Sequence, residues 1–86
     1  MSQKRLLANQ VLMRAFKEGD MNAYAHLMRK HQEAAHKIAF SFTKDEEKSS
    51  ELVIVVFMRL WNKRESIPEG ASIIAYLSKF IREVAA

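Results

Sequence analysis

The sequence contains no cysteine, one proline and two glycines in 86 residues. The lack of cysteine excludes a disulfide-stabilised secreted scaffold and any thiolate metal site. The shortage of glycine and proline argues against an all-β fold, because each hairpin needs its own turn residues. The longest uninterrupted apolar run, 52–58, is too short to span a membrane, and no long apolar region of the kind found in secretory signals follows the N-terminus. We therefore expect one small cytoplasmic domain.

Charge is plentiful but unevenly distributed. Lys and Arg number 14 against 10 Asp and Glu, a net charge of +4, and 49% of the residues are hydrophobic. Residues 1–43 carry seven basic and three acidic side chains, whereas residues 44–86 carry seven of each. A basic half suits nucleic acid or an acidic protein surface, with an ordinary solvated surface as the alternative.

Breaking residues divide the chain into four segments, each predicted to be a helix. The first runs over about 4–17 and is ended by Gly19, and the second runs over about 21–42 with Asp20 as its cap. The third follows the capping segment 43–47 and reaches about residue 63, and the last begins near Ser72 after the loop 64–70. The apolar residues expected to face the core are Leu7, Val11, Leu12, Ala15 and Phe16 in the first helix, Ala23, Tyr24, Leu27, Met28, Ala35, Ile38, Ala39 and Phe42 in the second, and Ile73, Ile74, Leu77, Phe80, Ile81 and Val84 in the last. The sequence thus predicts an all-α bundle of about four helices.

The third segment is ambiguous, because the β-branched run 52–57 alone resembles a buried strand. Helix-forming flanks and the lack of a second strand favour a helix. On a helical wheel, the residues that fall within one arc of roughly 140° are Val53, Val56, Phe57, Leu60 and Trp61. Ile54, Val55 and Met58 fall outside that arc and predict an outward apolar strip, bordered by Glu51, Arg59 and Asn62. The alternative is a central helix that is buried all round.

Patterns that would indicate catalysis or metal binding are missing from the sequence. His26, His31 and His36 are spaced by five residues, so on one helix they diverge by about 140° per step. Neither a phosphate-binding glycine loop nor a nucleophile elbow occurs. We expect no metal site, no cofactor and no enzymatic activity.

Three segments together resemble a known family. Residues 15–24 (AFKEGDMNAY) resemble the lkeGDxxAF opening of bacterial extracytoplasmic-function sigma factors. Residues 51–61 (ELVIVVFMRLW) are similar to the family's eDIVQDVFLKLW helix, and 63–67 (KRESI) continue the likeness. Residues 75–82 (AYLSKFIR) resemble its AYLfkiARN motif. The resemblance covers roughly 7–86 and implies the helical domain called region 2.

In that family, region 2 docks on the clamp helices of the RNA polymerase β′ subunit and holds the promoter −10 element as its strands separate. The resemblance implies that the polymerase-binding residues are Glu51, Ile54, Val55, Met58, Arg59 and Trp61. It likewise implies that the DNA-binding residues are Asn62, Lys63, Arg64, Ser66, Tyr76, Lys79 and Arg82. Cations near a strand-separation site would neutralise phosphates, and an aromatic ring could receive an unstacked base. For Tyr76 the alternative is a core residue with its hydroxyl at the edge.

The chain also departs from the family. Ile54 and Val55 stand where a Gln-Asp pair is usual, and Glu83 replaces an asparagine. The resemblance ends before the last helix should finish and includes no second DNA-binding domain, so we expect a truncated region 2. An alternative function is a degenerate sigma-like module for protein interaction or homodimerisation through the outward strip and Ile74. An anti-sigma factor is a further candidate partner, and an unrelated helical DNA-binding module is a third interpretation.

Overall fold

A computed structural model describes the backbone of residues 2–85 and the side chains of residues 9–85. The elements in chain order are α1 (Ser2–Lys17), α2 (Met21–Thr43), α3 (Glu46–Asn62), the single-turn 3-10 helix η1 (Arg64–Ser66) and α4 (Ile73–Ala85). No strand occurs between residues 2 and 85, and the ambiguous run 52–57 lies within α3. The predicted all-α fold is therefore confirmed.

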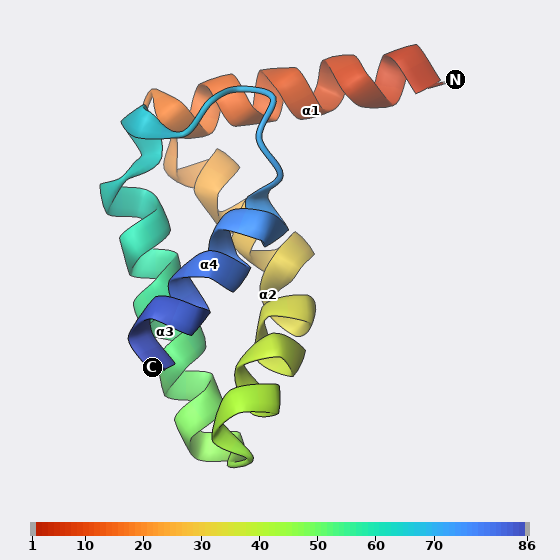
Figure 1. Cartoon of the computed structure of the whole chain (residues 1–86). Coiled ribbons are helices and arrows are strands. Elements are labelled where there is room, and N and C mark those ends of the chain that lie inside the picture. The colour runs from red at the N-terminus through yellow and green to blue at the C-terminus, as the bar shows by residue number, and fades with distance from the viewer. Residues whose placement is uncertain (1, 86) are drawn as a thin grey trace.

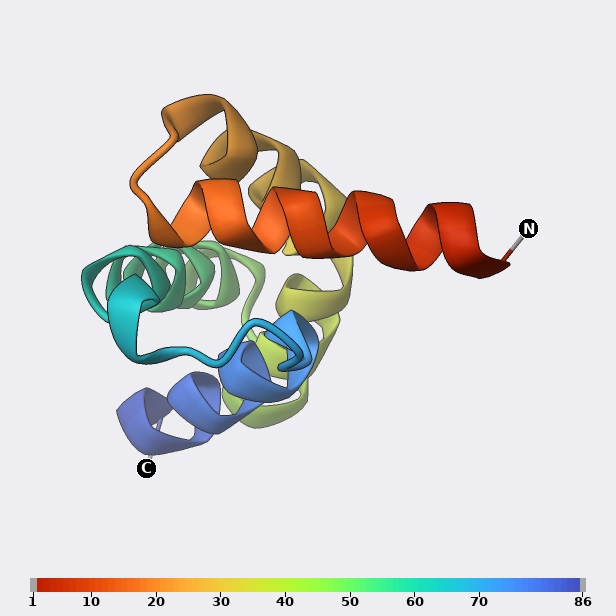
Figure 2. The same ribbon diagram turned by 90° about the horizontal axis from the view of Figure 1, so that it is seen from above.

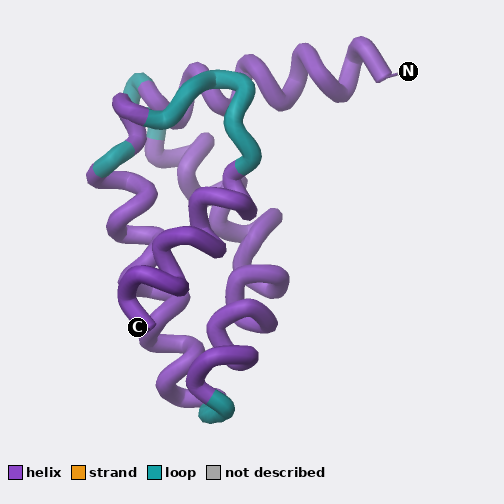
Figure 3. The backbone as a smooth tube through the Cα atoms, in the orientation of Figure 1, coloured by secondary structure: helices purple, strands orange, loops and turns teal. Residues whose placement is uncertain are grey.

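Helices α2, α3 and α4 pack together, and α1 crosses one end of this bundle (Figures 1 and 2). Helices α2 and α3 run side by side in opposite directions because the connection between them is short. The long segment between η1 and α4 returns over the same end of the bundle, beside α1 (Figure 3). There Arg14 Nε donates a hydrogen bond to Glu69 Oε1 at 3.3 Å, which joins α1 to that segment. The N-terminal part of α1 extends beyond the bundle (Figure 2).

The helix boundaries have the causes that the sequence predicts. Gly19 adopts a φ of 95°, a left-handed conformation that favours glycine. Asp20 Oδ1 accepts hydrogen bonds from the backbone amides of Asn22 and Ala23 at 2.8 and 3.1 Å. Ser72 Oγ accepts a hydrogen bond from the Ala75 amide at 3.3 Å and so caps α4. Side-chain caps therefore satisfy amides that α2 and α4 would otherwise leave unpaired.

The core agrees with the predicted apolar faces except at their margins. Val11, predicted to be buried, is 68% exposed. Met13 of the same helix is buried in the domain core instead. Phe42 and Val84, both predicted to be buried, are 49% and 37% exposed. They lie in the last turns of α2 and α4, where less of the bundle covers them. Leu7 lies outside the residues whose side chains are described.

The buried face of α3 differs from the predicted arc toward both ends of the helix. Leu52 and Ser49 are buried, whereas Val53 and Trp61 are only half-buried. The Ser49 hydroxyl lies 2.7 Å from the Asp45 carbonyl oxygen, to which it donates, and 2.6 Å from Thr43 Oγ1. Because this buried hydroxyl is paired, a serine can occupy a core position near the start of the helix.

Candidate functional site

The outward surface of α3 carries an uncovered apolar patch. Ile54 is 61% exposed, Val55 44% and Met58 59%, whereas Val56 and Leu60 on the opposite face are fully buried. Ile54 and Met58 are four residues apart and therefore adjacent along the helix surface. We call Ile54, Val55 and Met58 the α3 strip. The structure thus confirms that these three side chains point outward.

Two hollows flank Met58. One, of about 190 Å³, is lined by Met21, Tyr24, Met58, Trp61 and Asn62. The other is lined by Val55, Met58, Arg59, Asn62 and Lys63. Met58 therefore forms a ridge between an aromatic hollow and a hollow with a basic rim. Met21 and Tyr24 of α2 extend the surface of α3 here, which no pattern in the sequence indicates.

Arg59 joins the α3 strip to α4. Its Nη1 donates to Glu83 Oε2 at 3.1 Å, and its Cζ lies 5.7 Å from the centroid of the Phe80 ring. The pair is partly shielded from solvent, since the two side chains are 35% and 44% exposed. The carboxylate of Glu83, which departs from the family motif, is therefore offset by a cation.

Trp61 belongs to an aromatic cluster that draws on three helices. Its ring centroid lies 4.9 Å from that of Tyr24 in α2 and 6.3 Å from that of Phe16 in α1. The Tyr24 hydroxyl, in turn, donates to the carbonyl oxygen of Phe57 at 2.6 Å, and burial raises the pKa of this phenol. Trp61 is half-buried, so it supports the core while one side lines the hollow beside Met58.

The residues expected at DNA fall into two groups in the structure. Asn62 is exposed at the end of α3, Lys63 and Ser66 are exposed just after it, and Lys79 and Arg82 are exposed on α4. Arg64 is half-buried, with its Cζ 4.2 Å from the centroid of the Trp61 ring. Its guanidinium is already engaged within the chain.

The Phe80 ring brings the loop after α3 close to α4. Lys63 Nζ lies 6.0 Å from the centroid of Phe80, and the ring of Tyr76 meets the same residue edge-on at 6.1 Å. Tyr76 is half-buried, which agrees with both the edge-of-core and the base-stacking interpretations. Lys79 is three residues further along α4 and hence lies on the same side of that helix as Tyr76. A cationic surface thus extends from the loop onto α4.

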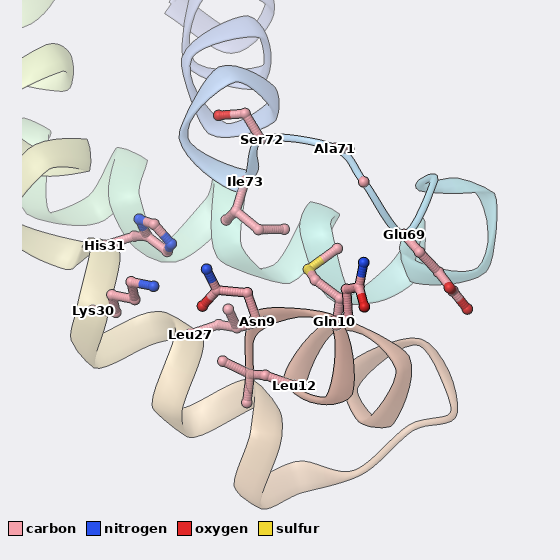
Figure 4. Close-up of a pocket in the computed structure, with 12 residues that line it drawn as sticks. Asn9, Gln10, Leu12, Leu27, Lys30, His31, Glu69, Ala71, Ser72 and Ile73 are labelled. Atoms are coloured by element: carbon pink, nitrogen blue, oxygen red, sulfur yellow. The ribbon is translucent and has the colours of Figure 1, made fainter. Parts of the chain in front are cut away.

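A separate hollow lies between α1, α2 and the start of α4 (Figure 4). Its volume is about 310 Å³ and its apolar floor includes Leu12, Leu27 and Ile73. The His31 side chain lies at its edge, and burial, together with the neighbouring Lys30 cation, lowers the pKa of this imidazole. None of the residues predicted to bind polymerase or DNA lines this hollow.

The three histidines diverge, as their spacing predicts. His26 is exposed, His31 is half-buried, and His36 Nε2 lies 2.9 Å from Glu46 Oε2. Among the described side chains, no group of three His, Asp or Glu residues is placed to hold a metal ion. None of the helices in the described part of the chain is both long and apolar enough to cross a membrane.

These features define a small helical domain with an exposed apolar surface on α3 and adjoining basic side chains on the loop and α4. The sigma-70 region 2 family matches residues 27–86, well over half of the chain, and the chain belongs to this family. Region 2 is a non-enzymatic part of sigma factors, which act in transcription initiation. No curated protein and no solved structure matches the chain. Helix α1 lies outside the matched residues.

Proposed function

We propose that this domain is of the extracytoplasmic-function type and docks on the clamp helices of the RNA polymerase β′ subunit through the α3 strip. The observation that carries the proposal is the exposure of three neighbouring large apolar side chains on a helix whose other face is in the core. A contiguous apolar patch of this kind on a small soluble fold is typical of a contact surface. Glu51, Arg59 and Trp61 border the strip and complete the proposed docking residues.

The chemistry of the strip sets the character of this contact. Ile54 and Val55 cannot form the hydrogen bonds and ion pairs available to the Gln-Asp pair that is usual in the family. Docking would therefore depend on burial of apolar surface, which salt screens little. We expect the affinity for a clamp-helix fragment to change little with ionic strength.

The test compares two valine-to-aspartate variants. Val55→Asp should abolish binding to a purified clamp-helix fragment, because docking would desolvate a carboxylate without a partner. Val11→Asp is the matched control, since Val11 is 68% exposed on α1 and away from the strip. Binding would be measured by calorimetry, with circular dichroism to establish that both variants are folded. Absence of binding by the folded wild-type domain, or equal loss in both variants, would contradict the proposal.

We further propose that the cationic surface beside the strip holds the single-stranded promoter −10 element. The proposed contacts are Asn62 at the end of α3, Lys63 and Ser66 just after it, and Tyr76, Lys79 and Arg82 on α4. Arg64, also expected at DNA, is stacked on the Trp61 ring. Side chains that neutralise phosphates give binding that weakens steeply with salt, in contrast to the clamp contact. Stronger binding to double-stranded than to single-stranded DNA would contradict this assignment.

Self-association is a second candidate function, and the same exposed strip favours it. Two copies related by a two-fold axis could bury their α3 strips against each other. The sequence predicts Ile74 as part of the self-contact surface, but its side chain packs against the core. The self-contact would therefore consist of Ile54, Val55 and Met58. Light scattering over a range of concentrations distinguishes the cases: a dimer disrupted by Val55→Asp supports self-association, and a monomer throughout excludes it.

A further inference from the structure

The side chain of Arg64 lies folded back against the end of α3. Its Cζ is 4.2 Å from the centroid of the Trp61 ring, and its Nη1 donates a hydrogen bond to the Trp61 carbonyl oxygen at 3.0 Å. The guanidinium therefore binds the π face and the backbone of one residue. A planar cation with several donors can form both contacts at once, whereas an ammonium group cannot match this geometry.

The turn between α1 and α2 encloses the guanidinium from another side. A β-carbon at Gly19 would be in ordinary van der Waals contact with the guanidinium, 3.5 Å from Arg64 Nη2 and 3.7 Å from Nε. Nε is buried and has no hydrogen-bond partner among the described residues. This cation has thus given up part of its hydration for contacts within the protein, which is unusual for a side chain that serves to meet phosphate.

Trp61 connects Arg64 to the core, because its ring packs against Tyr24 and Phe16. The single turn η1 contacts α1 and α3, and the Trp61 ring links its Arg64 to Tyr24 of α2. Asn62 and Lys63 lie between the two stacked residues in the sequence, and both are exposed. The Arg64–Trp61 stack therefore fixes the two ends of the short segment that presents Lys63 to solvent.

We propose that Arg64 is a positioning residue for the DNA-binding loop: it orders residues 62–66 by stacking on Trp61, while Lys63 supplies the phosphate contact. This role rests on the proposed function for its DNA partner. The stack itself can be tested without DNA. An ordered loop loses less conformational freedom on binding, so removal of the stack should weaken DNA binding even though no phosphate contact is lost.

The experiment measures binding of the full chain to a single-stranded DNA oligonucleotide of mixed sequence over a range of salt concentrations. The variants are Arg64→Gln, Arg64→Lys and Lys63→Gln. A lost phosphate contact should reduce the steepness of the salt dependence by about 0.7 per site, and we expect this only for Lys63→Gln. Both Arg64 variants should bind about three- to tenfold more weakly with the salt dependence unchanged, and lysine should not rescue binding.

Trp61 gives a second measurement, because it is the only tryptophan in the sequence. Its fluorescence should change in both Arg64 variants and stay unchanged in Lys63→Gln. In addition, Arg64→Gln should reduce the affinity for DNA only slightly in a Trp61→Leu background. The effects of two residues in direct contact are not additive, and the stack is already lost in Trp61→Leu.

Four results would contradict the positioning role of Arg64 or the proposed DNA function. A salt dependence lowered by Arg64→Gln, or full rescue by Arg64→Lys, would overturn the positioning role and assign Arg64 to phosphate. Unchanged fluorescence in the Arg64 variants would also overturn it, since the stack would then be absent. If the wild-type chain fails to bind DNA while the fluorescence changes as expected, the proposed DNA function fails and the stack remains only a structural contact.

Discussion

Val55 and Val56 are neighbouring residues of the same type in α3, about 100° apart around the helix axis. Val56 is fully buried and Val55 is 44% exposed. Replacement of either by alanine removes two methyl groups, which is worth about 1.6 kcal/mol when the side chain is fully buried. The cavity left at a buried site adds to this cost, and the higher helix propensity of alanine returns up to about 0.7 kcal/mol. A difference in stability between Val55→Ala and Val56→Ala therefore reports the burial of each side chain, because the residue type and the substitution are the same.

For Val56→Ala these contributions leave a destabilisation of roughly 1–2 kcal/mol. In a domain of this size, such a loss lowers the melting temperature by roughly 5–15 °C. For Val55→Ala only about half of the transfer free energy is lost, and the gain in helix propensity offsets nearly all of it. We expect the stability of that variant to lie within about 0.5 kcal/mol of the wild type.

Thermal unfolding followed by far-UV circular dichroism measures both variants against the wild type. Equal destabilisation by the two substitutions would mean that α3 is buried all round, as the alternative sequence interpretation holds. In that case the α3 strip would not be available to a partner. The proposed docking surface would then be wrong even if the fold were right.

Two further predictions concern polar side chains, the buried Tyr24 and the half-buried His31. Tyr24→Phe should destabilise the domain by about 1 kcal/mol in the same unfolding assay, because it removes the 2.6 Å hydrogen bond to the Phe57 carbonyl; an unchanged stability would show that this bond contributes nothing. His31 should make stability depend on pH, since burial and then Lys30 lower its pKa in the folded state below the ordinary value of 6.5. The unfolded chain then binds the proton more tightly, so stability is full above pH 6.5 and falls as the pH drops through that value toward the lower folded pKa. His31→Gln should flatten this dependence in denaturant titrations at several pH values, and an unchanged pH dependence in that variant would refute the assignment.

The helices and their ends could be predicted because their signals are local. Gly19, Asp20 and Ser72 act within one or two turns of their own positions, so the sequence alone identifies them. The helical nature of 52–57 also followed from its flanks, although the β-branched composition favoured a strand. Propensity is a weak signal there because burial against other helices determines the structure of the segment.

The margins of the core could not be predicted, because they depend on which helix covers which turn. A helical wheel gives the direction of Val11 and Met13 but not the point at which α1 crosses the bundle (Figure 2). The crossing buries Met13 and leaves Val11 exposed. Similarly, α3 buries Ser49 and Leu52, and the hydroxyl of Ser49 can be accepted in the core only because Asp45 and Thr43 pair with it.

The candidate site shows the same division between local and long-range signals. The outward direction of Ile54, Val55 and Met58 follows from spacing within one helix, and the structure confirms it. The pairing of Arg59 with Glu83 joins residues 24 positions apart, and Met21 reaches the α3 surface from another helix. No periodicity within a helix carries such information.

The Arg59–Glu83 pair also bears on how the apolar and cationic surfaces could act together. Glu83 would repel phosphates if it were free, but its carboxylate is offset by Arg59, whose guanidinium lies over Phe80. Lys63 and Tyr76 lie near the same Phe80 ring. Arg59 beside the α3 strip and these two proposed DNA-binding side chains therefore all pack on Phe80. Docking of a partner on the strip would enclose Arg59 and Glu83 further from water, where their separation would leave an uncompensated buried charge. Contact with polymerase would thereby hold α4 more firmly against α3 at the place where the −10 element is proposed to lie.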